Sequence, residues 1–325
     1  MMQAIITGAT GFIGSRLARL LLNSGYEVLA LGRKKWSEVD SKRLCENLKL
    51  TYIQLDMKDV SKLAILIKKH GFKIKKNCVF FHFAWGDSSG LSSLNVAGQY
   101  ENVLYTIESF KVAAAIKCAR YIYVGSMEEW FASEYLTLDY KIHNFFNRHV
   151  IYALPKKCAR DFLKAIAINY DIDLIIATNS HILGPNDTRD SFLKVTMEKL
   201  INNEYVEMTS GVQNFDCVNV SDCALAYKII AQKGKKNAEY HIGSSTPKTL
   251  KEYVESMMKF IESKEKRNAR VAFGKVSYND IILDLELFKS SLLQSDTGFK
   301  CEESFEDGLN ELYLWLKFAI LNESD

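Results

Sequence analysis

Apolar positions follow two alternating patterns along the first 180 residues of the chain. Short runs rich in Val, Ile, Leu and Phe are separated by longer segments whose apolar residues recur at helical spacing. The runs predict strands at residues 3–8, 27–32, 50–56, 78–84, 121–126 and 174–179. The intervening segments predict helices over 15–25, 59–71, 91–118 and 151–169, the first two of which end at Gly25 and Gly71, where a helix C-cap needs a left-handed residue. Apolar strands separated by helices are typical of a parallel sheet that is covered on both faces.

Beyond about residue 180 the predicted elements become shorter. They are a helix near 190–202, a strand near 216–220, helices near 222–233 and 249–261, and a lysine-rich loop or helix end at 262–270. We therefore predict an α/β fold with a doubly wound sheet domain over 1–180 and a smaller lobe over 181–325, with elements interleaved near 216–245. A cleft is expected at the carboxyl ends of the strands.

Composition excludes several classes of protein. Apolar residues make up 48% and charged residues 25%, a globular balance, and the scattered net charge of +3 does not indicate a nucleic-acid partner. The seven cysteines are odd in number and form no C-x-x-C, so we expect neither disulfides nor a metal site. The apolar stretch at 78–85 is too short to cross a membrane, and no leader precedes the first strand. We expect a cytoplasmic protein with no membrane partner.

Three glycines follow the first predicted strand in the sequence TGATGFIG. Gly8 permits a tight turn, Gly11 allows a pyrophosphate to approach, and Gly14 lets the helix pack on the strand. The helix N-terminus adds attraction for the anion. In this strand–turn–helix context the glycines predict a dinucleotide site, although the first gap is one residue wider than in the usual fingerprint.

The end of the second strand indicates which dinucleotide is bound. NAD is usually held there by an acidic residue on its ribose hydroxyls, but this strand ends in Gly32 and is followed by Arg33, Lys34 and Lys35. Guanidinium and ammonium groups suit a 2′-phosphate. The alternative is a solvated basic turn. We predict NADP(H) as the cofactor in preference to NAD(H).

Tyr152 and Lys156 stand four residues apart and share one face of the predicted helix. A phenol titrates near pH ~10, and a nearby ammonium is expected to lower that pKa, which would let Tyr152 exchange a proton with a substrate oxygen. Ser126 ends the fifth strand at the same edge of the sheet and could hold that oxygen. A chance tyrosine–lysine pair and a structural serine are the alternatives.

Several motifs occur in an order that identifies a family. They are TGATGFIG (7–14), HFAW (82–85), Asn95 in LNVAG, YVGSMEEW (123–130), YALPK (152–156), ILGPND (182–187), FDCVNVSDCALA (215–226) and GFKCEESFEDGL (298–309). With these motifs the chain resembles the extended short-chain dehydrogenase/reductases, particularly those that act on nucleotide sugars. The wider glycine gap is this family's form, and the match spans essentially the whole chain.

The resemblance implies a Rossmann-type doubly wound parallel sheet with a C-terminal substrate-binding lobe, and a homodimer formed through helices 91–118 and 151–169. It implies a catalytic triad of Ser126, Tyr152 and Lys156. The expected cofactor contacts are Gly8, Thr10, Gly11, Phe12, Ile13, Gly14, Arg33, Asp56, Met57, Phe83, Ala84, Trp85, Asn95, Tyr152, Lys156, Asn179, His181 and Ile182. The expected substrate contacts are Trp85, Ser126, Met127, Glu128 and Arg189.

The chain departs from the family at positions that bear on the reaction. Met127 stands where sugar-nucleotide dehydratases have an aspartate, which disfavours dehydration. The arginine that often grips the substrate diphosphate is absent from residues 213–216, which leaves Arg189 and Arg270 as candidates for that charge. Pro155 is tolerable only in the first turn of its helix.

These features favour NADPH-dependent reduction of a 4-keto-6-deoxy nucleotide sugar, as in the synthesis of surface polysaccharides. An epimerase that uses the same triad and a reductase of non-nucleotide carbonyls stay open as alternatives. A non-catalytic NADP-binding module is disfavoured because Tyr152 and Lys156 are both present. Glu128 is either a contact to a substrate hydroxyl or a capping residue.

Overall fold

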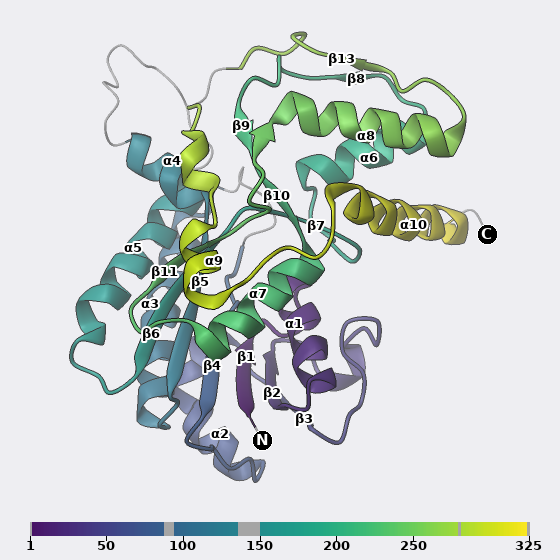
Figure 1. The fold of residues 1–325 in the computed structure, drawn as a ribbon. Coiled ribbons are helices and arrows are strands. Elements are labelled where there is room, and N and C mark those ends of the chain that lie inside the picture. The colour runs from purple at the N-terminus through teal and green to yellow at the C-terminus, as the bar shows by residue number, and fades with distance from the viewer. Residues whose placement is uncertain (1, 88–93, 136–149, 279–280, 324–325) are drawn as a thin grey trace.

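The fold is a parallel sheet with helices on both faces and a second, smaller lobe above one end (Figure 1). The structure is a computed structural model that describes residues 2–87, 94–135, 150–278 and 281–323. The sheet runs in the order β11-β6-β5-β4-β1-β2-β3, and every adjacent pair is parallel. Its strands are β1 (Gln3–Thr7), β2 (Glu27–Gly32), β3 (Leu50–Gln54), β4 (Cys78–His82), β5 (Arg120–Ser126), β6 (Asp173–Asn179) and β11 (Glu239–Ile242). The six predicted strands are confirmed; β11 was not predicted.

Two buried cores explain why the strands are apolar on both faces. Alternate residues of each strand point to opposite sides of the sheet, so that Ile6 and Phe81 join one core while Ile5 and Phe80 join the other. The first core is covered by α1 (Phe12–Asn23) and α7 (Val220–Lys233), and the second by α2 (Leu63–Lys69), α3 (Val96–Ala115) and α5 (Val150–Ala167). The predicted doubly wound α/β architecture is confirmed.

The helix boundaries differ in detail from the prediction. Gly25 and Gly71 adopt positive φ angles of 84° and 68° just after α1 and α2, which is the predicted way of ending them. The helix predicted at 59–71 is divided into a 3₁₀ turn (Met57–Lys62) and α2, and α1 begins three residues early. Residues 91–93 of the predicted helix 91–118 lie outside the described residues.

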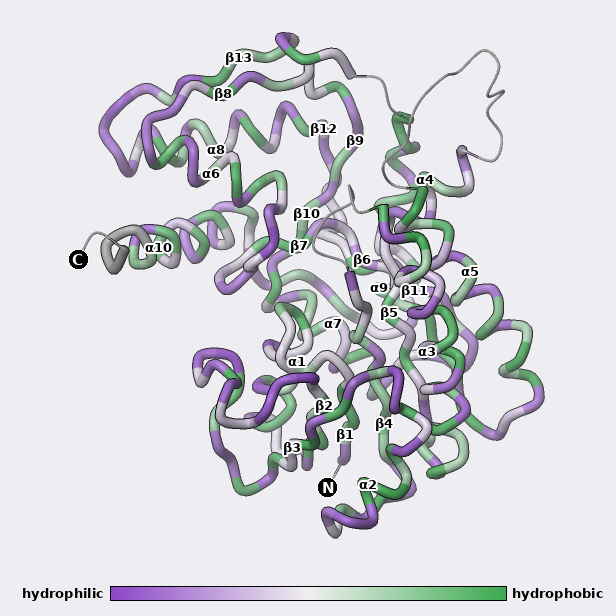
Figure 2. Tube along the Cα trace, turned by 180° about the vertical axis from the view of Figure 1, so that it is seen from behind, coloured by the Kyte–Doolittle hydropathy of each residue, from purple (hydrophilic) through white to green (hydrophobic). Residues whose placement is uncertain are grey.

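The second lobe has its own core, built by α6 (Phe192–Ile201), α8 (Leu250–Glu265) and α10 (Phe305–Glu323). The predicted lysine-rich segment begins as the end of α8, and α8 and α10 both alternate hydrophilic with hydrophobic residues along their length (Figure 2). None of the described helices combines the length and apolar character needed to span a membrane.

The lobe also contains three pairs of short strands, of which the sequence patterns predicted only β10, as the strand near 216–220. They are β7 (His181–Leu183) with β10 (Cys217–Asn219), β9 (Asn214–Phe215) with β12 (Lys248–Thr249), and β8 (Val206–Glu207) with β13 (Val271–Ala272). Also unpredicted are α4 (Glu128–Tyr135), α9 (Ser291–Thr297) and α10. The chain returns from the lobe to the sheet through α7 and β11; the domain boundary at 180/181 stays a prediction.

Candidate active site

The glycine loop between β1 and α1 lies against the segment that follows β4. Gly8 has a φ of 65°, and a Cβ there would lie 2.9 Å from the Ala84 amide nitrogen. A Cβ on Gly14 would lie 2.4 Å from the Gly8 carbonyl oxygen. No side chain caps the start of α1 at Gly11, so its first amides, including those of Phe12 and Ile13, can meet an anion. This bare cradle fits the pyrophosphate of a dinucleotide.

The turn after β2 presents a cation and has no room for an acid. A Cβ on Gly32 would lie 2.7 Å from the Tyr52 hydroxyl and 3.2 Å from the methyl group of Thr10. The Tyr52 hydroxyl and the Gln54 amide donate to the carbonyl oxygens of Lys34 (2.6 Å) and Arg33 (3.0 Å), which fixes the turn. The Arg33 side chain is exposed beside it.

Asp56 and Met57 lie half-buried at the end of β3, where the resemblance predicts adenine contacts. The Asp56 carboxylate accepts a hydrogen bond from the Lys58 amide (3.1 Å) and caps the following 3₁₀ turn. Their predicted contact with the cofactor stays a prediction.

The segment after β4 is held in place by side chains on both sides. The Ala84 amide donates to Thr7 Oγ1 (3.1 Å), and the Phe83 ring meets Tyr227 edge-on at 4.8 Å. The Trp85 indole donates to Gln99 Oε1 (2.8 Å). These contacts fix the segment against β1, α7 and α3.

Two buried amides on α3 that sequence reasoning missed fix the next residues of this loop. The Gln99 side chain donates to the Asp87 carbonyl (2.8 Å), and Asn102 pairs with both the amide and the carbonyl of Gly86 (2.8 and 2.9 Å). Polar residues three apart on a buried helix face were the signal that could have revealed them.

Ser126, Tyr152 and Lys156 come together at the carboxyl ends of the strands. Ser126 ends β5 and shares a side-chain hydrogen bond with Tyr152. Lys156 Nζ donates to the Val124 carbonyl (2.8 Å), and it lies 4.2 Å from the centre of the Trp85 ring and 6.0 Å from that of Tyr152. The catalytic roles of the three residues stay a prediction.

The electrostatics of the pair differ from the expectation drawn from the sequence. Burial raises the pKa of Tyr152 above its ordinary value, and Glu128 acts in the same direction, whereas Arg189 and Ser126 oppose the shift. Burial lowers the pKa of Lys156 to about 8, against the effect of Glu129. The expected acidification of the phenol is therefore wrong for this structure, because the loss of solvation outweighs the nearby cations. Tyr152 is a protonated donor at neutral pH.

Pro155 also departs from the expectation. It is buried at the sixth position of α5, in the second turn rather than the first. Proline has no amide hydrogen, so α5 lacks the backbone hydrogen bond from residue 155 to the carbonyl of Ile151. The helix tolerates this loss in the turn that carries Tyr152 and Lys156.

The predicted substrate contacts next to Ser126 point in different directions. Met127 is 4% exposed and packs in an apolar cluster with Leu283 and Phe288. Glu128 is buried at the start of α4, and its amide bonds to Ser126 Oγ (3.3 Å). The Glu128 carboxylate therefore lies near Tyr152, whereas the Met127 side chain packs in the apolar cluster with Leu283 and Phe288.

Of the two candidate cations for the substrate diphosphate, only Arg189 lies near Tyr152. Its guanidinium makes two bonds to Asp187 (2.8 and 3.1 Å), sits 5.5 Å from the centre of the Phe12 ring and lowers the pKa of Tyr152. Arg270 is exposed on the lobe and bonds to the Asn203 carbonyl.

Four other predicted cofactor contacts have structural partners. Asn95 caps α3 by accepting from the Gly98 amide (3.0 Å), and Asn179 Oδ1 accepts from the Tyr227 hydroxyl (2.8 Å). His181 stacks on Phe215 at 4.2 Å, and Ile182 packs against the core between the sheet and α7. Their contact with a cofactor stays a prediction.

A buried polar cluster around Asp216 ties the lobe to the sheet and was also missed. Ser180 Oγ donates to Asp216 (2.5 Å) and lies 2.8 Å from His241 Nε2, and the Ser244 amide also donates to Asp216 (3.0 Å). Phe215, directly before it, is buried. Within the described residues no cluster of three His, Cys, Asp or Glu side chains could hold a metal ion.

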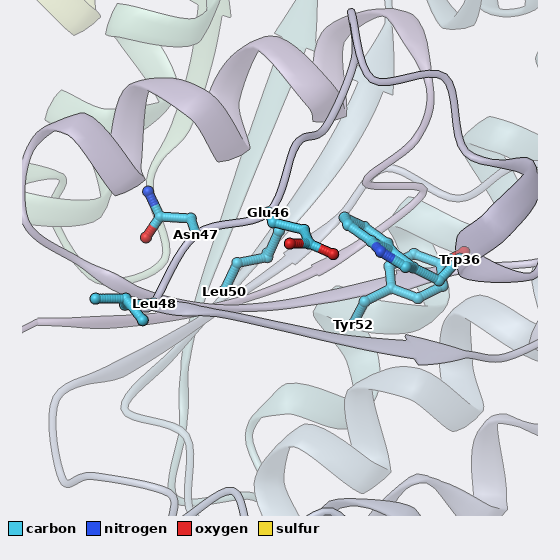
Figure 3. A pocket seen from close by; sticks show the side chains of 6 residues that line it. All are labelled: Trp36, Glu46, Asn47, Leu48, Leu50 and Tyr52. Atoms are coloured by element: carbon cyan, nitrogen blue, oxygen red, sulfur yellow. The ribbon is translucent and has the colours of Figure 1, made fainter.

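A separate hollow of about 530 Å³ lies at the far edge of the sheet beside β3 (Figure 3). Its lining residues are Trp36, Glu46, Asn47, Leu48, Leu50 and Tyr52. The candidate catalytic residues stand at the end of β5 instead, and three strands, β4, β1 and β2, separate β5 from β3, so this hollow is distinct from the candidate active site.

Comparisons with known proteins agree with this arrangement. The model of the NAD dependent epimerase/dehydratase family matches residues 4–243. The chain is 22% identical over 312 residues to the CDP-abequose synthase of Salmonella muenchen, covering 95% of this chain and 96% of that protein.

Two solved structures share the fold. UDP-glucose 4-epimerase from Thermotoga maritima with UDP-glucose has a TM-score of 0.75 and 16% identity, over 98% of this chain and 100% of the other. UDP-glucuronic acid 4-epimerase from Bacillus cereus, in complex with UDP-glucuronic acid and NAD, has a TM-score of 0.74 and 18% identity at the same coverage.

Proposed function

Since the chain belongs to the NAD-dependent epimerase/dehydratase family, we propose that it reduces the 4-keto group of a nucleotide sugar with NADPH. Membership of this family makes it an NAD(P)-dependent oxidoreductase of the extended short-chain dehydrogenase/reductase type. The observation that supports this most directly is the hydrogen-bonded Ser126–Tyr152 pair, in which the phenol stays protonated.

In the proposed reaction, NADPH supplies a hydride to C4 of the sugar when it is bound. Tyr152 donates its proton to the C4 oxygen, and the Ser126 hydroxyl holds that oxygen by a hydrogen bond. Lys156 supplies positive charge beside the phenol, which stabilises the phenolate that the proton transfer leaves. Its pKa of about 8 keeps it mostly charged at neutral pH.

The neighbouring residues favour reduction over the alternatives. A dehydratase-type acid is missing at Met127, whose side chain is buried in an apolar cluster. The exposed Arg33 and the crowded space beside Gly32 favour NADPH over a retained NAD. The names of the similar proteins refer to CDP- and UDP-linked sugars, which supports a nucleotide sugar as the substrate class.

The test is a screen of NADPH oxidation against 4-keto-6-deoxy sugars linked to CDP, UDP or dTDP, with the matching free sugars as controls. Turnover of a nucleotide-linked sugar alone is the expected result. Protein that carries tightly bound dinucleotide and interconverts epimers with none added would establish the epimerase alternative instead.

Replacing Arg33 with alanine tests the cofactor preference. We expect the Kd for NADPH to rise about 10- to 100-fold, because a bidentate guanidinium–phosphate contact is lost, and the Kd for NADH to change less than about twofold. Titration of protein fluorescence with each dinucleotide measures both constants. An equal rise for the two cofactors would contradict a 2′-phosphate contact.

We also propose that the chain forms a homodimer through α3 and α5. Val96, Tyr100 and Leu104 are 49%, 54% and 64% exposed and form one stripe on α3, and Phe162 is 50% exposed on the adjacent α5. Exposed apolar side chains on two helices that pack together are suited to a symmetric contact with a second copy.

Replacing Leu104 with glutamate is expected to shift the protein from dimer to monomer, because an unpaired charge would be buried in the interface. Sedimentation velocity measures the change, and Leu314→Glu on the exposed face of α10 is the matched control. A monomeric parent protein, or a dimer that survives Leu104→Glu, would rule out this interface.

A further inference from the structure

A buried carboxylate, Glu129, lies directly behind the proposed catalytic residues. It is 1% exposed in the first turn of α4, and its Oε1 accepts a hydrogen bond from the Ser126 amide at 2.9 Å. A Cβ on Gly125 would lie 2.8 Å from that oxygen. The glycine therefore makes room for the carboxylate to fold back against the end of β5.

The other oxygen of this carboxylate is paired with the helix that carries Tyr152 and Lys156. Glu129 Oε2 lies 3.2 Å from Arg160 Nη1, and Arg160 stands one turn beyond Lys156 on α5. Arg160 also bonds to Glu239 of β11, which in turn pairs with Lys164 at 2.5 Å. A chain of alternating charges thus joins α4, α5 and the edge of the sheet.

Glu129 and Lys156 are bonded to the same end of β5, because Lys156 Nζ donates to the Val124 carbonyl (2.8 Å) and Glu129 Oε1 accepts from the Ser126 amide (2.9 Å), two residues later. The Glu129 carboxylate opposes the burial that lowers the pKa of Lys156, and it contributes to the raised pKa values of Tyr123 and Tyr152. Burial also raises the pKa of Glu129 itself, against the effects of Arg160, the Ser126 amide and Lys156. Glu129 and Arg160 therefore each stabilise the charged form of the other.

Titratable groups near Lys156 come from the sheet and from the helices α4 and α5. They are His82 of β4, Tyr123 of β5, Glu129 of α4 and Tyr152 of α5. His82 is neutral in its buried site, because burial lowers its pKa to about 3. Glu129 is thus the anionic group in this set.

We propose that Glu129 is a positioning residue, which fixes the Ser126 end of β5 through one oxygen and keeps Lys156 protonated through its charge, while Arg160 keeps Glu129 ionised. Its consequence for catalysis rests on the proposed function. The protonation of Lys156 itself does not, so the two ideas can be tested apart.

The experiment is an NMR titration of Lys156 in the cofactor-free protein labelled with ¹³Cε-lysine, with the signal assigned by its absence in Lys156→Arg. In Glu129→Gln the midpoint for Lys156 is expected to fall by about one pH unit relative to the parent, since a partner anion is removed. In the matched control Glu239→Gln, which removes the other partner of Arg160, we expect a change below about 0.3 unit.

The same variants give a second readout if the reductase assay succeeds. Activity requires the charged lysine, so it is present below the pKa of Lys156 and lost as the pH rises through it. The alkaline limb of kcat/KM is therefore expected to move to lower pH in Glu129→Gln and to stay in place in Glu239→Gln. If the substrate screen fails but the Lys156 midpoint shifts as expected, the proposed reductase function is wrong and the role inferred for Glu129 still holds.

Two outcomes would overturn the inference: an unchanged Lys156 midpoint in Glu129→Gln, or an equal fall in Glu239→Gln. If Glu129→Gln does not fold because Arg160 is left unpaired, the double variant Glu129→Gln/Arg160→Gln removes both charges and is the substitute. The midpoint is expected to fall there too, since Glu129 is the charged partner that acts on Lys156.

Discussion

Replacing Tyr152 with phenylalanine is expected to lower kcat for NADPH oxidation about 10³-fold, while KM for the nucleotide sugar changes less than about threefold. The hydroxyl is the single group removed, and it is the proposed proton donor. The aromatic ring, which lies edge-on to Trp85 at 6.3 Å, keeps its place. Binding contacts therefore survive while the proton transfer is lost.

The control for this variant is Tyr205→Phe, which removes a hydroxyl from an exposed tyrosine of the lobe. It should match the parent in kcat and KM. Stopped-flow measurement of a single turnover separates the chemical step from product release. A Tyr152→Phe enzyme with the kcat of the parent would show that another group delivers the proton, and Glu128, buried one residue from Met127, would be the next residue to test.

The parts of this molecule that sequence patterns predicted are those where local chemistry decides the structure. The six strands were found because both of their faces are buried, so their residues read as continuous apolar runs. Gly25 and Gly71 were found because a left-handed residue after a helix favours glycine. β11 was missed: EYHI is short, and its position in the sheet depends on a partner strand, β6, more than fifty residues earlier.

The electrostatics of the site depend on burial, which no spacing rule reports. The four-residue interval between Tyr152 and Lys156 correctly placed them on one helix, but the sign of the change in the phenol pKa followed from desolvation. Glu129 looks like an ordinary surface residue in the run MEEW, and only the fold shows that it is buried against Gly125 and paired with Arg160. Charged residues are seldom fully buried without such a partner.

The second large expected effect is a loss of NADPH affinity when the glycine loop after β1 is altered. Two matched glycine variants, at Gly8 and Gly71, can isolate this effect. Gly8 and Gly71 have nearly equal φ angles of 65° and 68°, so alanine at either position costs about 1 kcal/mol in backbone strain. A Cβ on Gly71 meets nothing within 4 Å, whereas a Cβ on Gly8 would lie 2.9 Å from the backbone nitrogen of Ala84. Any difference between the two variants therefore reports the close contact.

Gly71→Ala is expected to lose about 1 kcal/mol in the free energy of unfolding and to bind NADPH like the parent. Gly8→Ala is expected to lose about 2–4 kcal/mol, because a backbone segment must shift, and to raise the Kd for NADPH about 100-fold or more. Urea denaturation and calorimetric titration measure the two quantities. The new methyl group at Gly8 would displace the segment Phe83 to Trp85, which borders both the glycine loop and Tyr152. Equal affinities of Gly8→Ala and Gly71→Ala for NADPH would therefore mean that the dinucleotide does not bind at this loop.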